Sequence, residues 1–338
     1  MSANDPSALH ALLAGVWFFI VGLFLVLYVV LDGFDLGVGM LSLFVGERRR
    51  ATMMLSLGSI WDANETWIVV LGGTLFGAFP LAYATLLHAL YVPIILMLLG
   101  FMLRGVSFEF HALSRRKALW GGLFGFGSLL AAVAQGFALG GMLAGIEVAH
   151  GHFDGSIWEW ASPFSAVVVI GVVAGYCLLG AGYLIIKTGG DIQAEFYRRS
   201  RALVWIMLAV ALAVTVWTPL RYPQVARRWF TMPDFYLFAV LPMLAGGAFL
   251  MLLRALRRRY ETAPFVWTLL IFVLSFLGLA ASLYPYIVPG SLTVTQAAAN
   301  SNTLVFMLLG IGMLIPVMLA YNAYQYVVFR GKVSEEGY

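Results

Sequence analysis

Four acidic residues stand out because they lie in pairs inside long apolar stretches of the sequence. Asp32 and Asp35 belong to the segment LDGFDLGVG, and Asp62 and Glu65 belong to WDANETW. A carboxylate placed in hydrocarbon costs roughly 2.5 to 3.5 kcal/mol on insertion scales, so such residues usually serve a transfer pathway, a partner or a cofactor. The sequence thus predicts a protein that handles protons or ions within a membrane.

The rest of the chain is suited to hold these acids in a bilayer. Of its 338 residues, 62% are hydrophobic and 11% are charged, and the mean hydropathy is +0.92. This composition excludes a soluble globular domain and a disordered chain. We therefore expect an all-α integral membrane protein that forms one membrane domain over residues 1–338.

Apolar windows long enough to cross a bilayer predict nine transmembrane helices. The windows cover residues 12–45, 54–79, 86–104, 120–145, 163–187, 202–219, 235–254, 265–288 and 303–329.

The connections between these windows alternate in charge. Every second connection is basic, and together these connections and the C-terminal segment hold 17 of the 20 Lys and Arg residues. The exception is the connection at 219–234, which contains Arg221, Arg227 and Arg228. By the positive-inside rule the N-terminus is periplasmic and the C-terminus cytoplasmic. Basic residues distributed in this way give no support for nucleic-acid binding.

The depth of the acids follows from counting along the first two predicted helices, which form a hairpin around Arg49. Asp35 lies 14 residues before Arg49 and Asp62 lies 13 after it, whereas Asp32 and Glu65 lie 17 before and 16 after. On antiparallel helices these carboxyls form two level pairs in the inner leaflet, about 4.5 Å apart. The i, i+3 spacing places both acids of a helix on one face, as a proton relay requires.

A structural role for the acids is the alternative. They could be hydrogen-bonded across helices, with Asn64 as a partner, or serve as counter-ions for cations on another subunit. Arg104 and Glu109, at the cytoplasmic end of the third predicted helix, form either a surface ion pair or the mouth of a proton route. His111 nearby is expected in water.

Ligands for a metal or a haem are not arranged for binding in this sequence. The five histidines are predicted near membrane edges, and Cys177 is the single cysteine. We therefore expect no metal site and no haem held by this chain alone. The histidines are His10, His88, His111, His150 and His152.

Six segments distributed along the chain are similar to segments of one membrane protein family. In order, they are LDGFDLGVGML, WDANETWIVVLGGTLFGAFPLAYA, FMLRGVSFEF, GSLLAAVAQGFALGG, YPYIVP and YQYVVFRGKV. They resemble subunit II of the cytochrome bd-type terminal quinol oxidases over residues 14 to 333. The short, Arg-rich connection RYPQVARRWF resembles the cyanide-insensitive branch of this family.

The resemblance implies an architecture and a set of partners. It implies two four-helix bundles, within 1–150 and 160–290, and in addition a peripheral ninth helix within 300–330. The chain pairs pseudosymmetrically with subunit I, which holds haem b and haem d and oxidises quinol. A small single-helix subunit is a further partner. The complex lies in the bacterial inner membrane and reduces O2 to water with cytoplasmic protons.

The resemblance also assigns roles to individual residues. Asp35 and Asp62 match acids on a cytoplasmic proton path, Asp32 belongs to the same motif, and Glu65 matches less firmly. Trp61 matches an aromatic position beside a bound quinone. No catalytic residue is expected in this chain itself.

The sequence therefore predicts a haem-free subunit II that stabilises subunit I and supplies carboxyls for proton uptake. A free-standing proton-coupled transporter is the alternative from another class. A structural scaffold without a proton role, within the same complex, is the third.

Overall fold

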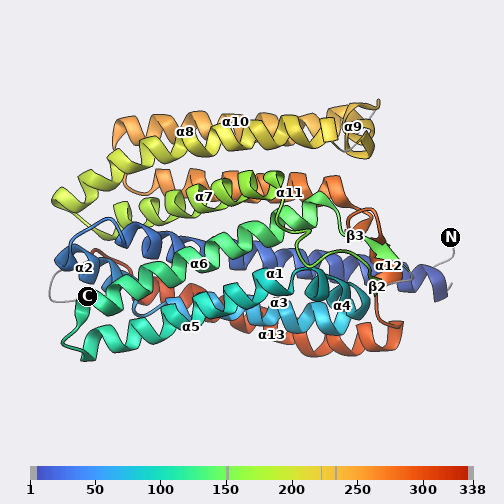
Figure 1. The fold of residues 1–338 in the computed structure, drawn as a ribbon, viewed down its shortest axis with the longest axis horizontal. Helices are drawn as coiled ribbons and strands as arrows, with labels where there is room; N and C mark the ends of the chain where they lie inside the picture. The colour runs from blue at the N-terminus through green and yellow to red at the C-terminus, as the bar shows by residue number, and fades with distance from the viewer. Residues whose placement is uncertain (1–5, 150–151, 222, 233, 334–338) are drawn as a thin grey trace.

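The computed structural model describes residues 6–149, 152–221, 223–232 and 234–333, and it is dominated by long helices that run along one common direction (Figure 1). The helices of the first half are α1 (Pro6–Ser42), α2 (Glu47–Leu57), α3 (Trp61–Ala78), α4 (Pro80–Ala89), α5 (Tyr91–Leu113) and α6 (Lys117–Ala144). Those of the second half are α7 (Pro163–Lys187), α8 (Gly190–Arg221), α9 (Pro223–Phe230), α10 (Asp234–Arg258), α11 (Ala263–Leu283), α12 (Val294–Ala297) and α13 (Ser301–Val328).

Eight of the described helices are long and apolar enough to cross a membrane: α1, α5, α6, α7, α8, α10, α11 and α13. Helix α3 corresponds to the second predicted span and is not among them. It has 18 residues, and its first two turns carry Asp62, Asn64 and Glu65, which lower its hydropathy. The chain is thus an all-helical multi-pass membrane protein, and a total of nine crossings stays a prediction.

Helix α1 lies at the centre of the fold, packed against α3, α6 and α7. In Figure 1, α8 and α10 run together on the far side of α7 and α11, whereas α13 lies beside α3 at the opposite edge. The two ends of the molecule differ: α2 and the C-terminus share one end, and the N-terminus marks the other. Two short antiparallel hairpins lie towards the N-terminal end, β1 (Val148–Ala149) with β2 (His152–Phe153) and β3 (Tyr286–Val288) with β4 (Leu292–Thr293).

Glycine allows α1 and α7 to cross with their backbones in contact. A Cβ atom on Gly37 would lie 1.8 Å from the carbonyl oxygen of Tyr176, and one on Gly180 would lie 2.5 Å from the amide nitrogen of Val38. Small residues are the usual means of close helix approach in membranes, where burial of apolar surface does not drive association. This crossing fixes the rotation of α1, and therefore the direction of its acidic side chains.

Two predicted helix boundaries were wrong in ways that matter for the acids. The chain between the first two spans forms the separate helix α2, so Asp62 lies in the first turn of α3 instead of deep within a span that begins at residue 54. Helix α5 continues to Leu113, nine residues beyond the predicted end at Arg104. Arg104 therefore lies about 13.5 Å along the helix from its C-terminal end, inside the protein.

Candidate functional site

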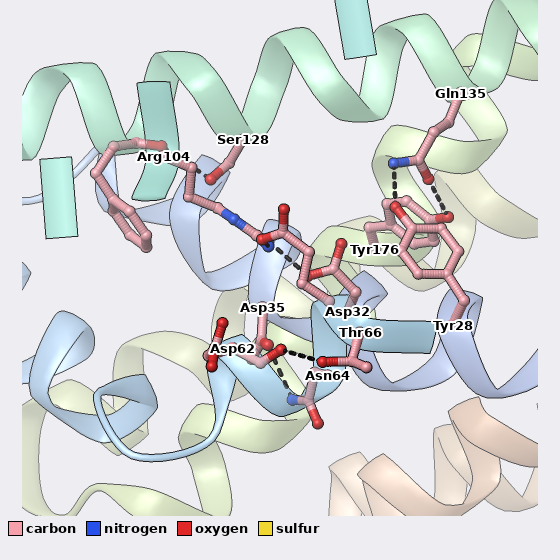
Figure 2. Close-up of polar contacts among 12 residues, drawn as sticks. Tyr28, Asp32, Asp35, Asp62, Asn64, Thr66, Arg104, Ser128, Gln135 and Tyr176 are labelled. Carbon is pink, nitrogen blue, oxygen red and sulfur yellow. Dashed lines mark hydrogen bonds and ion pairs between the residues drawn. The ribbon is translucent and has the colours of Figure 1, made fainter. Parts of the chain in front are cut away.

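Arg104 of α5 connects the two acidic segments in the interior of the protein (Figure 2). Its Nη1 lies 2.6 Å from Oδ1 of Asp32 on α1, and its Nη2 donates a hydrogen bond of 2.5 Å to Oε2 of Glu65 on α3. Asp32 and Arg104 are fully buried, with 0% and 1% of their side-chain surface exposed, whereas Glu65 is 22% exposed. Asp32 and Glu65, which the sequence predicted at one depth, thus share one guanidinium as their partner.

Asp35 is the second buried acid of α1, and it is held by an amide instead of a cation. Asn64 Nδ2 donates a hydrogen bond of 2.9 Å to Oδ2 of Asp35, and Asn64 Oδ1 accepts one of 2.9 Å from the hydroxyl of Tyr326 on α13. The cross-helix bond from Asn64 was among the sequence expectations. The predicted pairing of Asp35 with Asp62 was wrong, because Asp62 is exposed on α3 while Asn64 faces α1.

A polar network continues from the cluster along α1 (Figure 2). Tyr28 lies one turn before Asp32 on the same face of the helix, and its hydroxyl accepts a hydrogen bond of 2.6 Å from Gln135 Nε2 on α6. Gln135 Oε1 in turn accepts a hydrogen bond of 2.8 Å from the Tyr176 hydroxyl on α7. The sequence interpretation missed these residues, although Gln135 is the one amide side chain within the apolar window 120–145.

The cluster also contains polar atoms that have no hydrogen-bond partner among the described residues. They include Oδ2 of Asp32, Oδ1 of Asp35 and Nε of Arg104. Buried polar atoms are normally paired with protein groups or with ordered water.

Glu109 does not belong to this cluster. Its side chain is exposed, and the ion-pair partners of Arg104 are Asp32 and Glu65. Of the two alternatives for Arg104 and Glu109, the surface ion pair was therefore wrong, and the mouth of a proton route stays a prediction. The reason is geometric: Arg104 lies well inside α5 and turns inward, whereas Glu109, five residues later, faces outward.

His111 and Trp61 take part in packing close to the cluster. His111 is buried, and its Nε2 lies 2.9 Å from Oε1 of Glu47 on α2, which corrects the expectation that this histidine lies in water. The ring of Trp61 stacks on Phe108 at a centroid distance of 5.4 Å.

The described histidines outside the cluster also have protein neighbours. His10 contacts the carbonyl oxygen of Thr295, and the ring of His88 packs on Phe153. Among the residues with described positions, no three His, Cys, Asp or Glu side chains are grouped to hold a metal ion.

This fold and site define a polytopic helical membrane protein that holds ionisable side chains inside the bilayer. Residues 13–329 match the family of the cytochrome bd terminal oxidase subunit II, and the chain belongs to this family.

The relatives agree with this assignment over almost their whole length. The chain is 28% identical to the cytochrome bd-I ubiquinol oxidase subunit 2 of Escherichia coli strain K12, with 97% of each chain covered. It is 27% identical to the cytochrome bd ubiquinol oxidase subunit 2 of Bacillus subtilis strain 168, over 96% of this chain and 98% of the relative. The solved structure of the bd oxidase from Geobacillus thermodenitrificans contains a chain with the same fold, with a TM-score of 0.73 and 18% identity over 91% of this chain and 97% of that one.

The protein is therefore a subunit of a terminal quinol oxidase, an oxidoreductase complex of the bacterial inner membrane. As subunit II it implies a partner subunit I, and the family places the haems in that partner. The transporter alternative is not supported.

Proposed function

We propose that this chain conducts protons from the cytoplasm towards the oxygen-reducing haem of subunit I through the cluster of Asp32, Glu65 and Arg104. The observation that carries this proposal is the continuous contact from partly exposed Glu65, through Arg104, to fully buried Asp32. A scaffold could join the same helices with Ser or Asn, which insert into a membrane at lower cost than acids.

The charge balance of the cluster favours proton exchange. Asp32, Asp35 and Glu65 contribute three carboxyl groups around the single cation of Arg104. In a low-dielectric interior an excess of like charge is costly, so the cluster approaches neutrality when two carboxyls hold protons. Because such groups titrate as a coupled set, a proton arriving at Glu65 can be released at another member.

The route that we propose begins at the end of the molecule that carries α2 and the C-terminus. The excess of Lys and Arg in alternate connections supports placing this end in the cytoplasm and the N-terminus in the periplasm. Glu109 and Asp62 are exposed, Glu109 near the C-terminal end of α5 and Asp62 in the first turn of α3. Glu109 would collect protons at the surface, and Asp62 would meet the partner subunit. By packing against subunit I, the chain would also shield that subunit from lipid.

The cofactors follow from the same proposal. Haem b and haem d would lie in subunit I, in a pseudosymmetric pair with this chain, and the electrons would come from quinol. Trp61, already stacked on Phe108, offers an aromatic surface beside which a structural quinone would bind. A small single-helix subunit would complete the complex.

The test is oxygen consumption by the purified two-subunit complex with quinol as the reductant. We expect Asp32→Asn and Asp35→Asn to lower turnover per haem at least about tenfold, because each removes a proton-carrying group. Asp154→Asn, an exposed change in the outer loop, serves as the matched control and should leave turnover unchanged. The scaffold interpretation predicts the opposite pattern: a lower haem content, with normal turnover for each haem that remains.

A further inference from the structure

A charged pocket of about 460 Å³ is lined by residues of α2, α8 and the segment after α10, and none of its lining residues belongs to the acidic cluster. It lies between α2, the first turns of α8 and the end of α10. Four arginines and two acids contribute to it. The lining residues are Arg49, Asp191, Ala194, Glu195, Tyr197, Arg198, Arg201 and Arg259.

The positive charge of this pocket is only partly balanced. Oε2 of Glu195 lies 2.6 Å from Nη1 of Arg49, and its other carboxylate oxygen binds Arg199 one turn further along α8. Arg198 and Arg201 form no ion pair among the described residues, and both are exposed. Four arginines against the two carboxylates of Asp191 and Glu195 leave the lining with an excess of positive charge. Such a surface suits an anion with several oxygens, because each guanidinium can donate two parallel hydrogen bonds.

Arg259 extends the basic surface from the side of α10. It follows the last residue of that helix with a φ of 56°, a left-handed conformation in which glycine is usually found. Its carbonyl accepts a hydrogen bond of 3.0 Å from the hydroxyl of buried Tyr197, and its guanidinium lies 6.0 Å from the centre of the same ring. These contacts with Tyr197 hold the Arg259 guanidinium at the lining of the pocket.

The surface next to the pocket is apolar and faces outward. Helix α8 is long and apolar enough to cross a membrane over Gly190–Leu220, and only 6% of its apolar stretch is buried inside the protein. Trp205 and Ile206, one turn after Arg201, are 55% and 43% exposed. A molecule bound at the arginines would therefore have hydrocarbon immediately beside it. A ligand with a negative head and an apolar tail matches both features.

We propose that this pocket binds the phosphodiester headgroup of an anionic phospholipid from the cytoplasmic leaflet, with its acyl chains along α8. Basic pockets between transmembrane helices on the cytoplasmic side are suited to such headgroups. A soluble phosphate ion shares the chemistry of the headgroup but would gain nothing from the apolar surface around Trp205.

The experiment uses the purified two-subunit complex, delipidated in neutral detergent and titrated with phosphatidylglycerol, while native mass spectrometry counts the bound lipids. Phosphatidylcholine, which has the same phosphodiester but no net charge, is titrated in parallel. Two variants remove charge from the pocket, Arg198→Gln with Arg201→Gln, and Arg259→Gly. The matched control is Arg257→Gln with Arg258→Gln, which removes two exposed charges from the same end of α10 outside the pocket.

We expect a site that prefers phosphatidylglycerol to phosphatidylcholine at least tenfold. Its affinity should fall about fivefold for each arginine removed, and so roughly 25-fold in the double variant. Arg259→Gly also relieves the left-handed backbone, so a loss of lipid in this variant cannot be explained by misfolding.

Three results would overturn the proposal. The first is equal affinity for the two lipids, and the second is an equal loss of affinity in the control variant. The third is complete displacement of phosphatidylglycerol by millimolar inorganic phosphate, which would identify a soluble anion as the ligand.

Discussion

Replacing Arg104 with methionine tests whether the buried cluster is organised around its single cation. The guanidinium is 1% exposed and balances Asp32, which is 0% exposed, so its removal leaves a buried carboxylate without a counter-ion. Breaking a buried ion pair from one side costs about 3 to 5 kcal/mol. The variant can avoid this only by holding Asp32 protonated. At pH 7 that costs about 4 kcal/mol, from an ordinary aspartate pKa near 3.9 and 1.36 kcal/mol per pH unit. Both estimates give the same destabilisation.

The second estimate also predicts how this loss changes with pH. Protonating the carboxyl becomes easier by 1.36 kcal/mol for each unit that the pH falls. The deficit of Arg104→Met should therefore shrink from about 4 kcal/mol at pH 7 to about 1.5 kcal/mol at pH 5. Adding Asp32→Asn and Glu65→Gln to the same chain removes the unpaired charges, and it should restore all but about 1 kcal/mol at either pH.

The assay is unfolding of the purified complex in a titration with SDS, followed by tryptophan fluorescence at pH 7 and pH 5. Wild type, Arg104→Met and the triple variant are prepared in the same way and compared at the same protein concentration. The reasoning would be refuted if Arg104→Met lost less than 1 kcal/mol of unfolding free energy, or if the loss did not depend on pH. It would also be refuted if the triple variant were no more stable than Arg104→Met.

Three further predictions concern the contacts around the cluster and the C-terminal segment. Gly37→Ala forces a methyl group into the backbone of α7, so we expect a loss of about 1 to 3 kcal/mol in the same SDS titration. Gly15→Ala, on the same helix with nothing within 4 Å, should be neutral. Trp67→Phe removes the 2.7 Å hydrogen bond between α3 and α13 and should cost about 1 to 3 kcal/mol, because it leaves a buried acceptor unpaired. A hydrogen bond from Lys332 lowers the pKa of Glu261 below its ordinary value of 4.5. This contact is therefore complete above that value and lost as the pH falls through the lowered pKa. The protection factors of amides near the C-terminus, corrected for the intrinsic exchange rate at each pH, should therefore fall in acid, and Glu261→Gln should abolish this pH dependence.

The sequence by itself determined the class of protein and much of the site. Hydropathy predicted helices at nearly every place where they occur, and the window 163–187 coincides with α7. Hydropathy is sufficient for this because backbone N–H and C=O groups in lipid must form hydrogen bonds within their own helix. Length and apolarity therefore identify a membrane crossing. Counting from Arg49 also placed Asp32 level with Glu65, since the rise per residue of a helix is fixed.

Only the tertiary structure decided which of these polar groups meet. An ion pair between Arg104 and Glu109 was one of two alternatives because both lie in one motif, yet the rotation of α5 turns Arg104 towards Asp32, 72 residues earlier in the chain. Likewise the close crossing of α1 and α7 at Gly37, which leaves no room for a Cβ atom, sets the direction of the acidic side chains on α1. Helix rotation depends on side-chain packing between distant segments, and a one-dimensional pattern of hydropathy contains no record of it.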